Sequence, residues 1–285
     1  MSFIRSAYSK VPTGVKSAIH RLLKPYRVFK TSGLDRPSPL RIKTFGRFEV
    51  AFRSNTDDEA ALTRSLDRDA LIARLPTYRP NETDIIIDVG AHIGTFALLA
   101  ASKVPRGRVY AIEPCEDSFN LLRINASLNK LQNLLTFHVA LADDQGICKL
   151  HYEFGNQGHS IVHPFSNYGE LVECCTLQNF LDENRIGTCD LIKFNCEGAE
   201  FPILLSSPPD LLKRIKNMLV LYHSDLWTKD TLEELLAHLY ASGFECKNTG
   251  QYSERRGWIF ATYCSDHVGA RTAFSPKFAG IGAIA

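Results

Sequence analysis

Residues 84–94 have the sequence Asp84-Ile85-Ile86-Ile87-Asp88-Val89-Gly90-Ala91-His92-Ile93-Gly94. The apolar, β-branched run between the two aspartates is typical of a strand that is covered on both faces of a sheet. Gly90 would let the chain turn sharply after this strand, and Gly94 would let it pass close to a ligand. Because residues 95–103 have the pattern of a helix, the helix N-terminus and nearby backbone amides would suit a carboxylate or a phosphate.

Strands and helices alternate along the chain after this stretch. Residues 108–113 predict a second strand, residues 118–129 an amphipathic helix and residues 134–139 a third strand. This order implies a parallel sheet with right-handed crossovers. Further elements are predicted at 147–153, 171–176, 190–195 and 218–222 for strands, and at 201–206 and 231–242 for helices. Strands at 244–247 and 258–263 would form a closing hairpin, so we predict a Rossmann-like α/β fold, mostly parallel with a closing antiparallel strand.

The beginning of the chain differs from the rest in charge. Residues 1–34 contain no Asp or Glu, and their basic side chains are Arg5, Lys10, Lys16, Arg21, Lys24, Arg27 and Lys30. Apolar side chains at helical spacing from Val15 to Leu23 predict an amphipathic helix that Pro25 would end. Such a helix can bind an anionic membrane surface peripherally. The alternatives are a solvated extension, an oligomer contact and an organelle transit peptide.

The chain is predicted to divide into four segments: 1–41, a basic leader; 42–83, an N-terminal hairpin (42–53) and helix; 84–263, the α/β domain; and 264–285, a tail. A linker is expected at Pro37 and Pro39. The N-terminal helix would be capped by Asp57 or Asp58 and run to about Leu75.

The composition limits the class of protein. Of the 285 residues, 45% are hydrophobic and 22% are charged, as in a globular domain with a sizeable core. Outside residues 1–34 there are 33 − 7 = 26 basic against 31 acidic side chains, and because an acidic body neutralises phosphates poorly we expect no nucleic acid partner. The eight cysteines form no Cys-x-x-Cys pair and are expected to be reduced. Without a long apolar segment or a secretory signal, the protein is expected in the cytoplasm.

Glu113 ends the second predicted strand, 113 − 88 = 25 residues after Asp88. An acidic side chain at this place accepts hydrogen bonds from two ribose hydroxyls, which points to a nucleoside ligand at the carboxyl edge of the sheet. Both NAD and S-adenosylmethionine (SAM) contain such a ribose. The Gly-x-x-x-Gly spacing of Gly90 and Gly94 differs from the Gly-x-Gly-x-x-Gly dinucleotide fingerprint, which argues against an NAD-dependent oxidoreductase.

A later strand also ends in polar side chains. Residues 190–200 are Asp190-Leu191-Ile192-Lys193-Phe194-Asn195-Cys196-Glu197-Gly198-Ala199-Glu200. Because parallel strands bind ligands at their carboxyl ends, Asn195, Glu197 and Glu200 are candidates for the site, with helix capping and structural ion pairing as the alternatives. Lys193 lies inside the strand, where an unpaired charge is costly, so we expect it to pair with Glu197, Glu200 or a carboxylate elsewhere.

Together these segments resemble the FkbM family of SAM-dependent methyltransferases, from about residue 84 to residue 243. The matching stretches are Ile87 to Gly94, Val109-Tyr110-Ala111-Ile112-Glu113-Pro114, Val139-Ala140-Leu141, and Asp190 to Glu200. The resemblance implies a class I methyltransferase fold, SAM as cofactor, and O-methylation of a hydroxyl on a glycan or natural product.

The resemblance also implies roles for residues by position. Asp88, Gly90 and Gly94 would line the methionine end of SAM, and His92 of the same turn is counted with them. Glu113 would hold the ribose, and the neighbouring residues Ala140 and Leu141 would lie near the adenine. Lys193, Asn195 and Glu200 would serve the substrate or the structure.

The chain departs from the family pattern at two positions. The family usually has Asn where this chain has His92, and Asp where it has Asn195. Because Asn cannot act as a carboxylate base or an anionic metal ligand, a catalytically altered or inactive SAM-binding protein is the alternative function. We expect the general base to be Glu197, His223 or His159, in that order, since histidine titrates near neutrality.

Two other functions are not favoured. No metal site is predicted, because His151 and His163 lack partners at metal-ligand spacing. Methylation of an adenine nitrogen usually involves an Asn/Asp-Pro-Pro-aromatic motif, and the sequence here is Asn195-Cys196-Glu197-Gly198.

Overall fold

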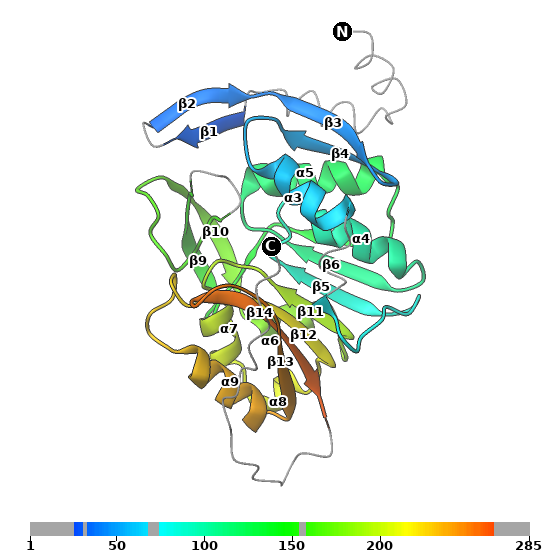
Figure 1. Cartoon of the computed structure of the whole chain (residues 1–285), viewed down its shortest axis with the longest axis vertical. Helices are drawn as coiled ribbons and strands as arrows, with labels where there is room; N and C mark the ends of the chain where they lie inside the picture. The colour runs from blue at the N-terminus through cyan, green and yellow to red at the C-terminus, as the bar shows by residue number, and fades with distance from the viewer. Residues whose placement is uncertain (1–25, 31–32, 68–73, 154–157, 265–285) are drawn as a thin grey trace.

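The computed structural model describes residues 26–30, 33–67, 74–153 and 158–264. Its centre is a sheet of seven strands in the order β13-β14-β12-β11-β5-β6-β7 (Figure 1). The strands are β5 (Ile85–Val89), β6 (Arg108–Ile112), β7 (Leu134–Phe137), β11 (Leu191–Phe194), β12 (Asn217–His223), β13 (Phe244–Ser253) and β14 (Arg256–Tyr263). The pairs among β5, β6, β7, β11 and β12 are parallel, and β14 is antiparallel to both β12 and β13. The predicted fold class is therefore confirmed.

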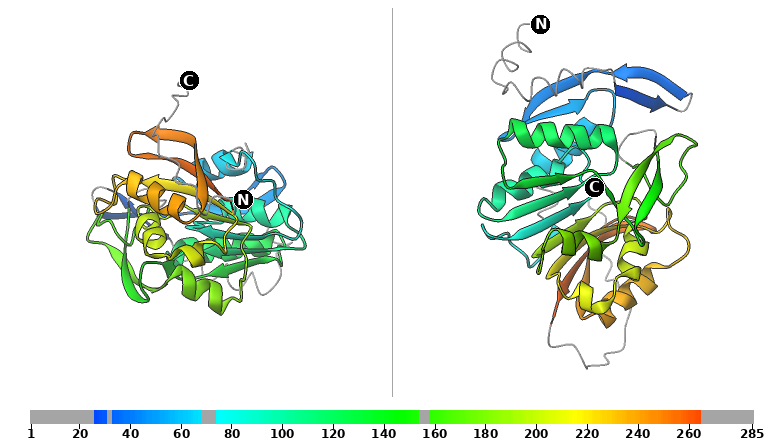
Figure 2. Two further views of the ribbon diagram at one scale, coloured as in Figure 1. Left: turned by 90° about the horizontal axis from the view of Figure 1, so that it is seen from below. Right: turned by 180° about the vertical axis from the view of Figure 1, so that it is seen from behind.

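Helices cover both faces of this sheet (Figure 2). They are α4 (Thr95–Lys103), α5 (Glu116–Leu128), α6 (Leu177–Glu183), α7 (Glu200–Ser206), α8 (Pro209–Leu212) and α9 (Leu232–Ala241). Adjacent strand residues point into different cores: Ile86 packs with α4 and α5, whereas Ile87 packs with α6, α7 and α9. Each strand is thus apolar on both faces, as expected of a parallel sheet between two helical layers.

The N-terminal hairpin belongs to the same core. It consists of β3 (Leu40–Phe45) and β4 (Phe48–Arg53), which pair antiparallel as predicted for residues 42–53. The buried amide of Asn125 in α5 accepts a hydrogen bond from Ala51 N at 2.7 Å and donates to Ala51 O at 3.1 Å. Asn125 also donates to Ile93 O at 2.8 Å, so it links the hairpin to the turn that follows β5.

Two expectations for the N-terminal segments need correction. The helix expected from Asp57 or Asp58 to about Leu75 is α-helical only over α3 (Asp58–Leu62) and continues as a π-helix (Thr63–Asp67); residues 68–73 lie outside the described residues, and Leu75 is not helical. The π-helical turn changes the backbone hydrogen-bond spacing, which periodicity in the sequence does not reveal.

The linker expected around Pro37 is instead part of a strand. Strands β1 (Tyr26–Lys30) and β2 (Gly33–Ser38) form an antiparallel hairpin in which Pro37 is paired with Arg27. In this two-stranded sheet both strands are edges, and proline is tolerated in edge strands. The amphipathic helix predicted between Val15 and Leu23 lies outside the described residues.

A smaller sheet lies beside the carboxyl edge of the central one (Figure 1). It consists of β8 (Ala140–Leu141), β10 (Gly169–Cys175) and β9 (Gly146–His151), in that order. Strand β10 runs parallel to β8 and antiparallel to β9. Within the described part of the chain, no helix is long and apolar enough to span a membrane.

Candidate active site

A cavity of about 590 Å³ lies at the carboxyl ends of the parallel strands. Most of the residues predicted for the site line it: Gly90, His92, Glu113, Ala140, Leu141, His159, Lys193, Asn195, Glu197 and His223. Asp88, Gly94 and Glu200 are not among the lining residues, and the side chains of Asp88 and Glu200 are fully buried. These three residues therefore lie behind the wall of the cavity.

The glycine turn after β5 is shaped by its protein neighbours. Gly90 has a positive φ of 74°, and a Cβ at this position would collide with the carbonyl oxygen of Asn195. Gly94 has a φ of 95°, and its Cβ would lie 2.9 Å from Leu122 in α5. Gly94 thus makes room for α5, and its expected approach to a ligand stays a prediction.

Glu113 is held by two backbone amides. One carboxylate oxygen accepts a hydrogen bond from His92 N at 2.7 Å and the other accepts from Cys115 N at 2.9 Å. Burial raises the pKa of Glu113, and His92 together with the two amides opposes this rise. Each carboxylate oxygen can accept more than one hydrogen bond, so Glu113 retains capacity for hydroxyl donors in the cavity.

Lys193 pairs with Asp88, on the adjacent strand. Its Nζ lies 2.6 Å from Asp88 Oδ1 and donates to Gly90 O at 3.3 Å. The two residues are register partners of β11 and β5, and both are buried. Asp88 therefore faces Lys193, which corrects its predicted place in the lining of the cavity. The Lys193 partner is neither Glu197 nor Glu200.

A buried polar cluster links the N-terminal hairpin to the glycine turn. This cluster was not predicted from the sequence. Arg53 donates to Asp58 through Nε at 2.8 Å and through Nη2 at 2.9 Å, and Nη2 also lies 3.1 Å from Ser118 Oγ. His92 Nε2 lies 3.1 Å from Asp58 Oδ1. Burial alone would raise the pKa of Asp58, but Arg53 and His92 hold it well below its usual range. A lone arginine after the apolar run Val50-Ala51-Phe52 is the signal that marks this cluster in the sequence.

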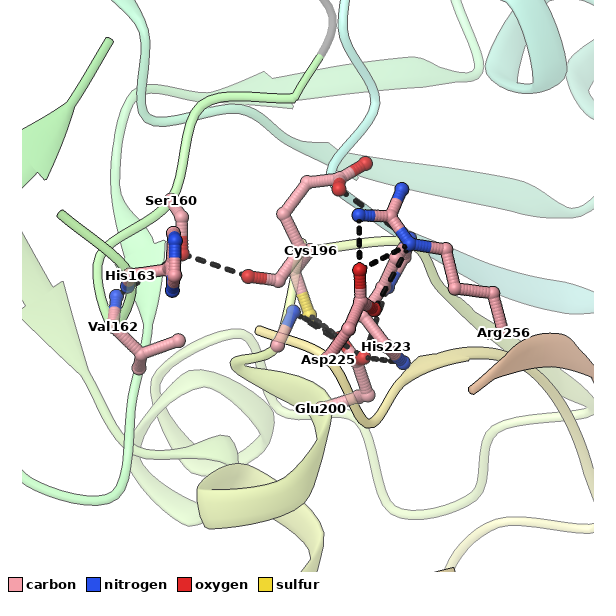
Figure 3. Close-up of polar contacts among 10 residues, drawn as sticks. Ser160, Val162, His163, Cys196, Glu200, His223, Asp225 and Arg256 are labelled. Carbon is pink, nitrogen blue, oxygen red and sulfur yellow. Dashed lines mark hydrogen bonds and ion pairs between the residues drawn. The ribbon is translucent and has the colours of Figure 1, made fainter. Parts of the chain in front are cut away.

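The loop after β11 has an unusual backbone. Glu197 and Gly198 have consecutive positive φ values of 51° and 97°. Ser160 Oγ donates a hydrogen bond of 2.7 Å to the carbonyl oxygen of Glu197 (Figure 3). A side chain on Gly198 would lie 2.9 Å from Val162. A non-glycine residue in this conformation is strained, and such strain is concentrated at functional sites.

His223 lies between two carboxylates. Its Nε2 is 3.3 Å from Glu197 Oε2, and its Nδ1 is 3.0 Å from Glu200 Oε1. The carboxylate of Glu200 also accepts hydrogen bonds from His223 N at 2.7 Å and from Gly198 N at 3.0 Å, so it fixes the imidazole from behind (Figure 3).

His223 and Glu197, which both line the cavity, have perturbed pKa values. Burial lowers the pKa of His223, but Glu200 and Glu197 raise it by more, so the net shift is upward. Burial raises the pKa of Glu197, and His223 and Arg256 only partly oppose this. The pair thus combines a carboxylate of increased basicity with an imidazole that is stabilised in its protonated form.

The hydrogen bonding of His159 disfavours it as a base, because its one free lone pair is already used. Its Nδ1 accepts a hydrogen bond of 2.9 Å from Glu153 N, and burial lowers its pKa to about 3. The ring is therefore neutral with its hydrogen on Nε2, which makes it a hydrogen-bond donor. This contradicts its prediction as a candidate base.

Asn195 contributes a neutral group to the cavity wall. Within the described residues its buried Oδ1 has no hydrogen-bond partner. No group of three or more His, Cys, Asp or Glu side chains in the described part of the chain is placed to hold a metal ion.

The strand order, the glycine turn after β5 and the carboxylate after β6 are those of the class I methyltransferase fold. The model of the methyltransferase FkbM domain matches residues 88–246, which is more than half of the chain. The chain therefore belongs to the FkbM family of methyltransferases, and SAM is its cofactor. This membership excludes the alternative of an NAD-dependent oxidoreductase.

Several known proteins are similar to this chain. The hexuronic acid methyltransferase AglP of Haloferax volcanii is 22% identical over 214 residues, covering 75% of this chain and 85% of AglP. The methyltransferase sdnD of Sordaria araneosa is 25% identical over 181 residues, covering 52% of this chain and 68% of sdnD. The crystal structure of methyltransferase FkbM from Methylobacillus flagellatus KT aligns with a TM-score of 0.47 and 14% identity, covering 71% of this chain and 48% of that one. This chain thus spans about half the length of that crystallised protein.

Proposed function

We propose that this protein transfers a methyl group from SAM to a hydroxyl of a sugar or natural-product acceptor. The observation that carries the proposal is the arrangement of Glu197, His223 and Glu200, which provides a base at the cavity wall. The name of AglP, a hexuronic acid methyltransferase, supports a sugar acceptor.

The cavity suits the cofactor. Glu113 has acceptor capacity for the ribose hydroxyls, and the turn from Gly90 to His92 would receive the methionine end. Ala140 and Leu141, which line the cavity, would contact the adenine. When bound, SAM supplies a methyl group on a positively charged sulfur, which needs alignment with the acceptor oxygen and exclusion of water.

Glu197 would remove the proton from the acceptor hydroxyl as the new bond forms. When His223 is neutral, its Nε2 can take the proton onward from Glu197, and Glu200 stabilises the imidazolium through Nδ1. In this arrangement the acceptor hydroxyl is the nucleophile, Glu197 is the base, and His223 orients the base. General base catalysis of this kind contributes about 10²- to 10⁴-fold to the rate.

The same groups favour a hydroxyl over a carboxylate as the methylated group. A carboxylate is already ionised at neutral pH, so it needs no base. Placed against Glu197, whose side chain is 14% exposed, it would also meet a like charge. The base therefore has a use only if the acceptor oxygen starts protonated.

The test is methyl transfer from labelled SAM to fractionated glycans, lipids and small molecules. We expect labelled product that survives mild alkali, because methyl ethers are stable there and methyl esters are hydrolysed. Glu197→Gln should lower turnover by about 10²- to 10⁴-fold, with SAM affinity retained. Asn195→Asp, two residues earlier after the same strand, is the control, and it should not raise turnover strongly.

Three outcomes would contradict the proposal. Alkali-labile product would indicate carboxyl methylation. Full activity of Glu197→Gln together with a strong gain in Asn195→Asp would reverse the roles of the two residues. SAM binding without transfer to any fraction would favour the catalytically inactive alternative. Circular dichroism of both variants controls for misfolding at the strand end.

A further inference from the structure

Three residues from distant parts of the chain meet at one side of the cavity. Arg74 precedes β5, Tyr252 lies in β13 and Trp258 lies in β14, and all three line the cavity. The guanidinium carbon of Arg74 is 5.4 Å from the ring centroid of Tyr252 and 5.6 Å from that of Trp258. Trp258 Nε1 donates to the Tyr252 hydroxyl at 2.8 Å, and Arg74 Nη2 lies 3.4 Å from the same oxygen. The guanidinium is therefore held by two aromatic rings.

The backbone of β13 is adapted to this guanidinium. Arg74 Nη1 donates to the carbonyl oxygen of Thr249 at 3.1 Å. The register of β13 shifts between Asn248 and Gly250, and the Asn248 side chain accepts a hydrogen bond from Gly250 N at 2.9 Å. A Cβ on Gly250 would collide with Nη1 of Arg74. A bulge with a glycine at this position thus makes the space that the arginine fills.

Arg74 differs from two other cations that line the cavity, because each of those is paired with a carboxylate. Lys193 is paired with Asp88 at 2.6 Å, and Arg256 is paired with Asp225 at 2.7 Å. Across the described ranges of the chain, Arg74 forms no such ion pair with a carboxylate. A guanidinium carries five N–H donors in a rigid fork, and such a fork matches a carboxylate or phosphate.

The strand order places this group away from the nucleoside. Glu113 and Ala140 follow β6 and β7, on one side of β5 and β11. Arg74 contacts β13 and β14, which lie beyond β12 on the other side. The cation therefore faces the half of the cavity that is left for the acceptor.

We propose that Arg74 binds an anionic group of the acceptor, a carboxylate or a phosphate, so that the acceptor is an acidic or phosphorylated sugar. This inference rests on the proposed transfer to a sugar hydroxyl. The anionic group is not the methylated one, because it contacts Arg74 while the reacting hydroxyl contacts Glu197. Arg74 is thus a residue of substrate specificity.

The test measures binding, which does not depend on turnover. Calorimetry with saturating S-adenosylhomocysteine would compare phenyl glucuronide with phenyl glucoside, which differ at a carboxylate, and glucose 6-phosphate with glucose. We expect the wild-type protein to bind at least one charged probe about 10- to 100-fold more tightly than its neutral counterpart, the range of a charge-assisted hydrogen bond. The pair that shows the preference distinguishes a carboxylate from a phosphate.

Two variants should abolish the preference, and one should keep it. Arg74→Met removes the guanidinium, and Gly250→Ala displaces it, so each should bring the charged-to-neutral ratio to within about twofold of one. Arg255→Met is the matched control, because Arg255 is an exposed arginine of the same hairpin that does not line the cavity. SAM affinity should stay within about twofold of wild type in all three, because none of these residues is expected to contact the cofactor.

The outcomes separate this inference from the proposed function. No preference in the wild type, or a preference that survives Arg74→Met, would overturn the inference. Tenfold weaker SAM binding in Arg74→Met without a change in the probe ratio would also overturn it, since the arginine would then serve the cofactor. If Arg74 confers the preference but no hydroxyl is methylated, the anion site stands and the proposed transfer to a hydroxyl fails alone.

Discussion

Replacement of Lys193 by Met should destabilise the fold in a way that depends on pH. The buried Asp88 carboxylate would lose the partner that lies 2.6 Å away. Among the described residues its second oxygen, Oδ2, already has no hydrogen-bond partner. Removing one member of a buried ion pair costs about 3–5 kcal/mol of unfolding free energy, because the other charge stays buried and unpaired.

Protonation of Asp88 limits this cost. An Asp carboxyl has an ordinary pKa of about 3.9, and protonating it costs about 1.4 kcal/mol for each pH unit above this pKa. The cost is therefore about 4 kcal/mol at pH 7 and about 1.5 kcal/mol at pH 5. In the wild-type fold burial already raises the pKa of Asp88 and Lys193 opposes this rise, so without Lys193 the pKa rises further above its value in the unfolded state. The unfolded state therefore releases its proton first as the pH rises, and the destabilisation grows with pH.

Urea unfolding, monitored by circular dichroism at pH 7 and at pH 5, would measure this loss of unfolding free energy. We expect Lys193→Met to lose about 3–4 kcal/mol at pH 7 and less than half of that at pH 5, relative to wild type. Adding Asp88→Asn should recover most of the loss, because no buried charge remains. Lys216→Met is the control: its partner Asp190 is at a similar distance, 2.7 Å, but Lys216 is 60% exposed, so it should lose at most about 1 kcal/mol. Equal losses in Lys193→Met and Lys216→Met, or a Lys193→Met loss that ignores pH, would refute the argument.

Three further predictions concern the cofactor, the base and the leader. Glu113→Ala should weaken SAM binding by about 1.5–3 kcal/mol in calorimetry, and unchanged affinity would remove Glu113 from the ribose site. Turnover should rise with pH as His223 loses its proton, at a pH above the ordinary histidine pKa of about 6.5. Glu200→Gln should move this rise to lower pH, because it removes a carboxylate that raises the pKa of His223. A pH profile that does not move would contradict the proposed base. The full chain should co-sediment with anionic vesicles but not with neutral ones, less so as salt rises, and deleting residues 1–34 should abolish this binding. Equal partitioning with and without the leader would exclude the membrane contact.

Much of the central sheet could be predicted from the sequence because its strands are buried on both faces. Runs such as Ile85-Ile86-Ile87 are apolar throughout, and β5, β6, β11 and β12 were all located to within a residue or two at each end. Shorter elements were missed. The helix α6 begins after Thr176, which caps it through Asn179 N, but Thr176 also continues the apolar pattern of β10. Short helices are stabilised by tertiary packing more than by their own sequence, so local patterns identify them poorly.

The contacts of the site depend on strand register and packing, which the sequence does not state. Lys193 was expected to have a carboxylate partner, yet only the register of β11 with β5 makes Asp88 that partner. The contact between Arg53 and His92 joins residues on different elements, brought together where the hairpin packs on α5. The cavity residues could be predicted because parallel strands end at one edge, whereas their pairings could not.

The neutral side chain of Asn195 follows from these pairings. A carboxylate at this position would be a buried anion, and the nearby cation of Lys193 is already paired with Asp88. Burial would raise the pKa of an unpaired carboxylate here until it took up a proton, whereas at Glu197 the neighbouring His223 opposes this rise. In this chain the proposed base lies two residues later, at Glu197, which has a left-handed backbone and whose side chain is 3.3 Å from His223. The departure from the family pattern at Asn195 is therefore compatible with a base in the cavity, because a different residue carries the charge.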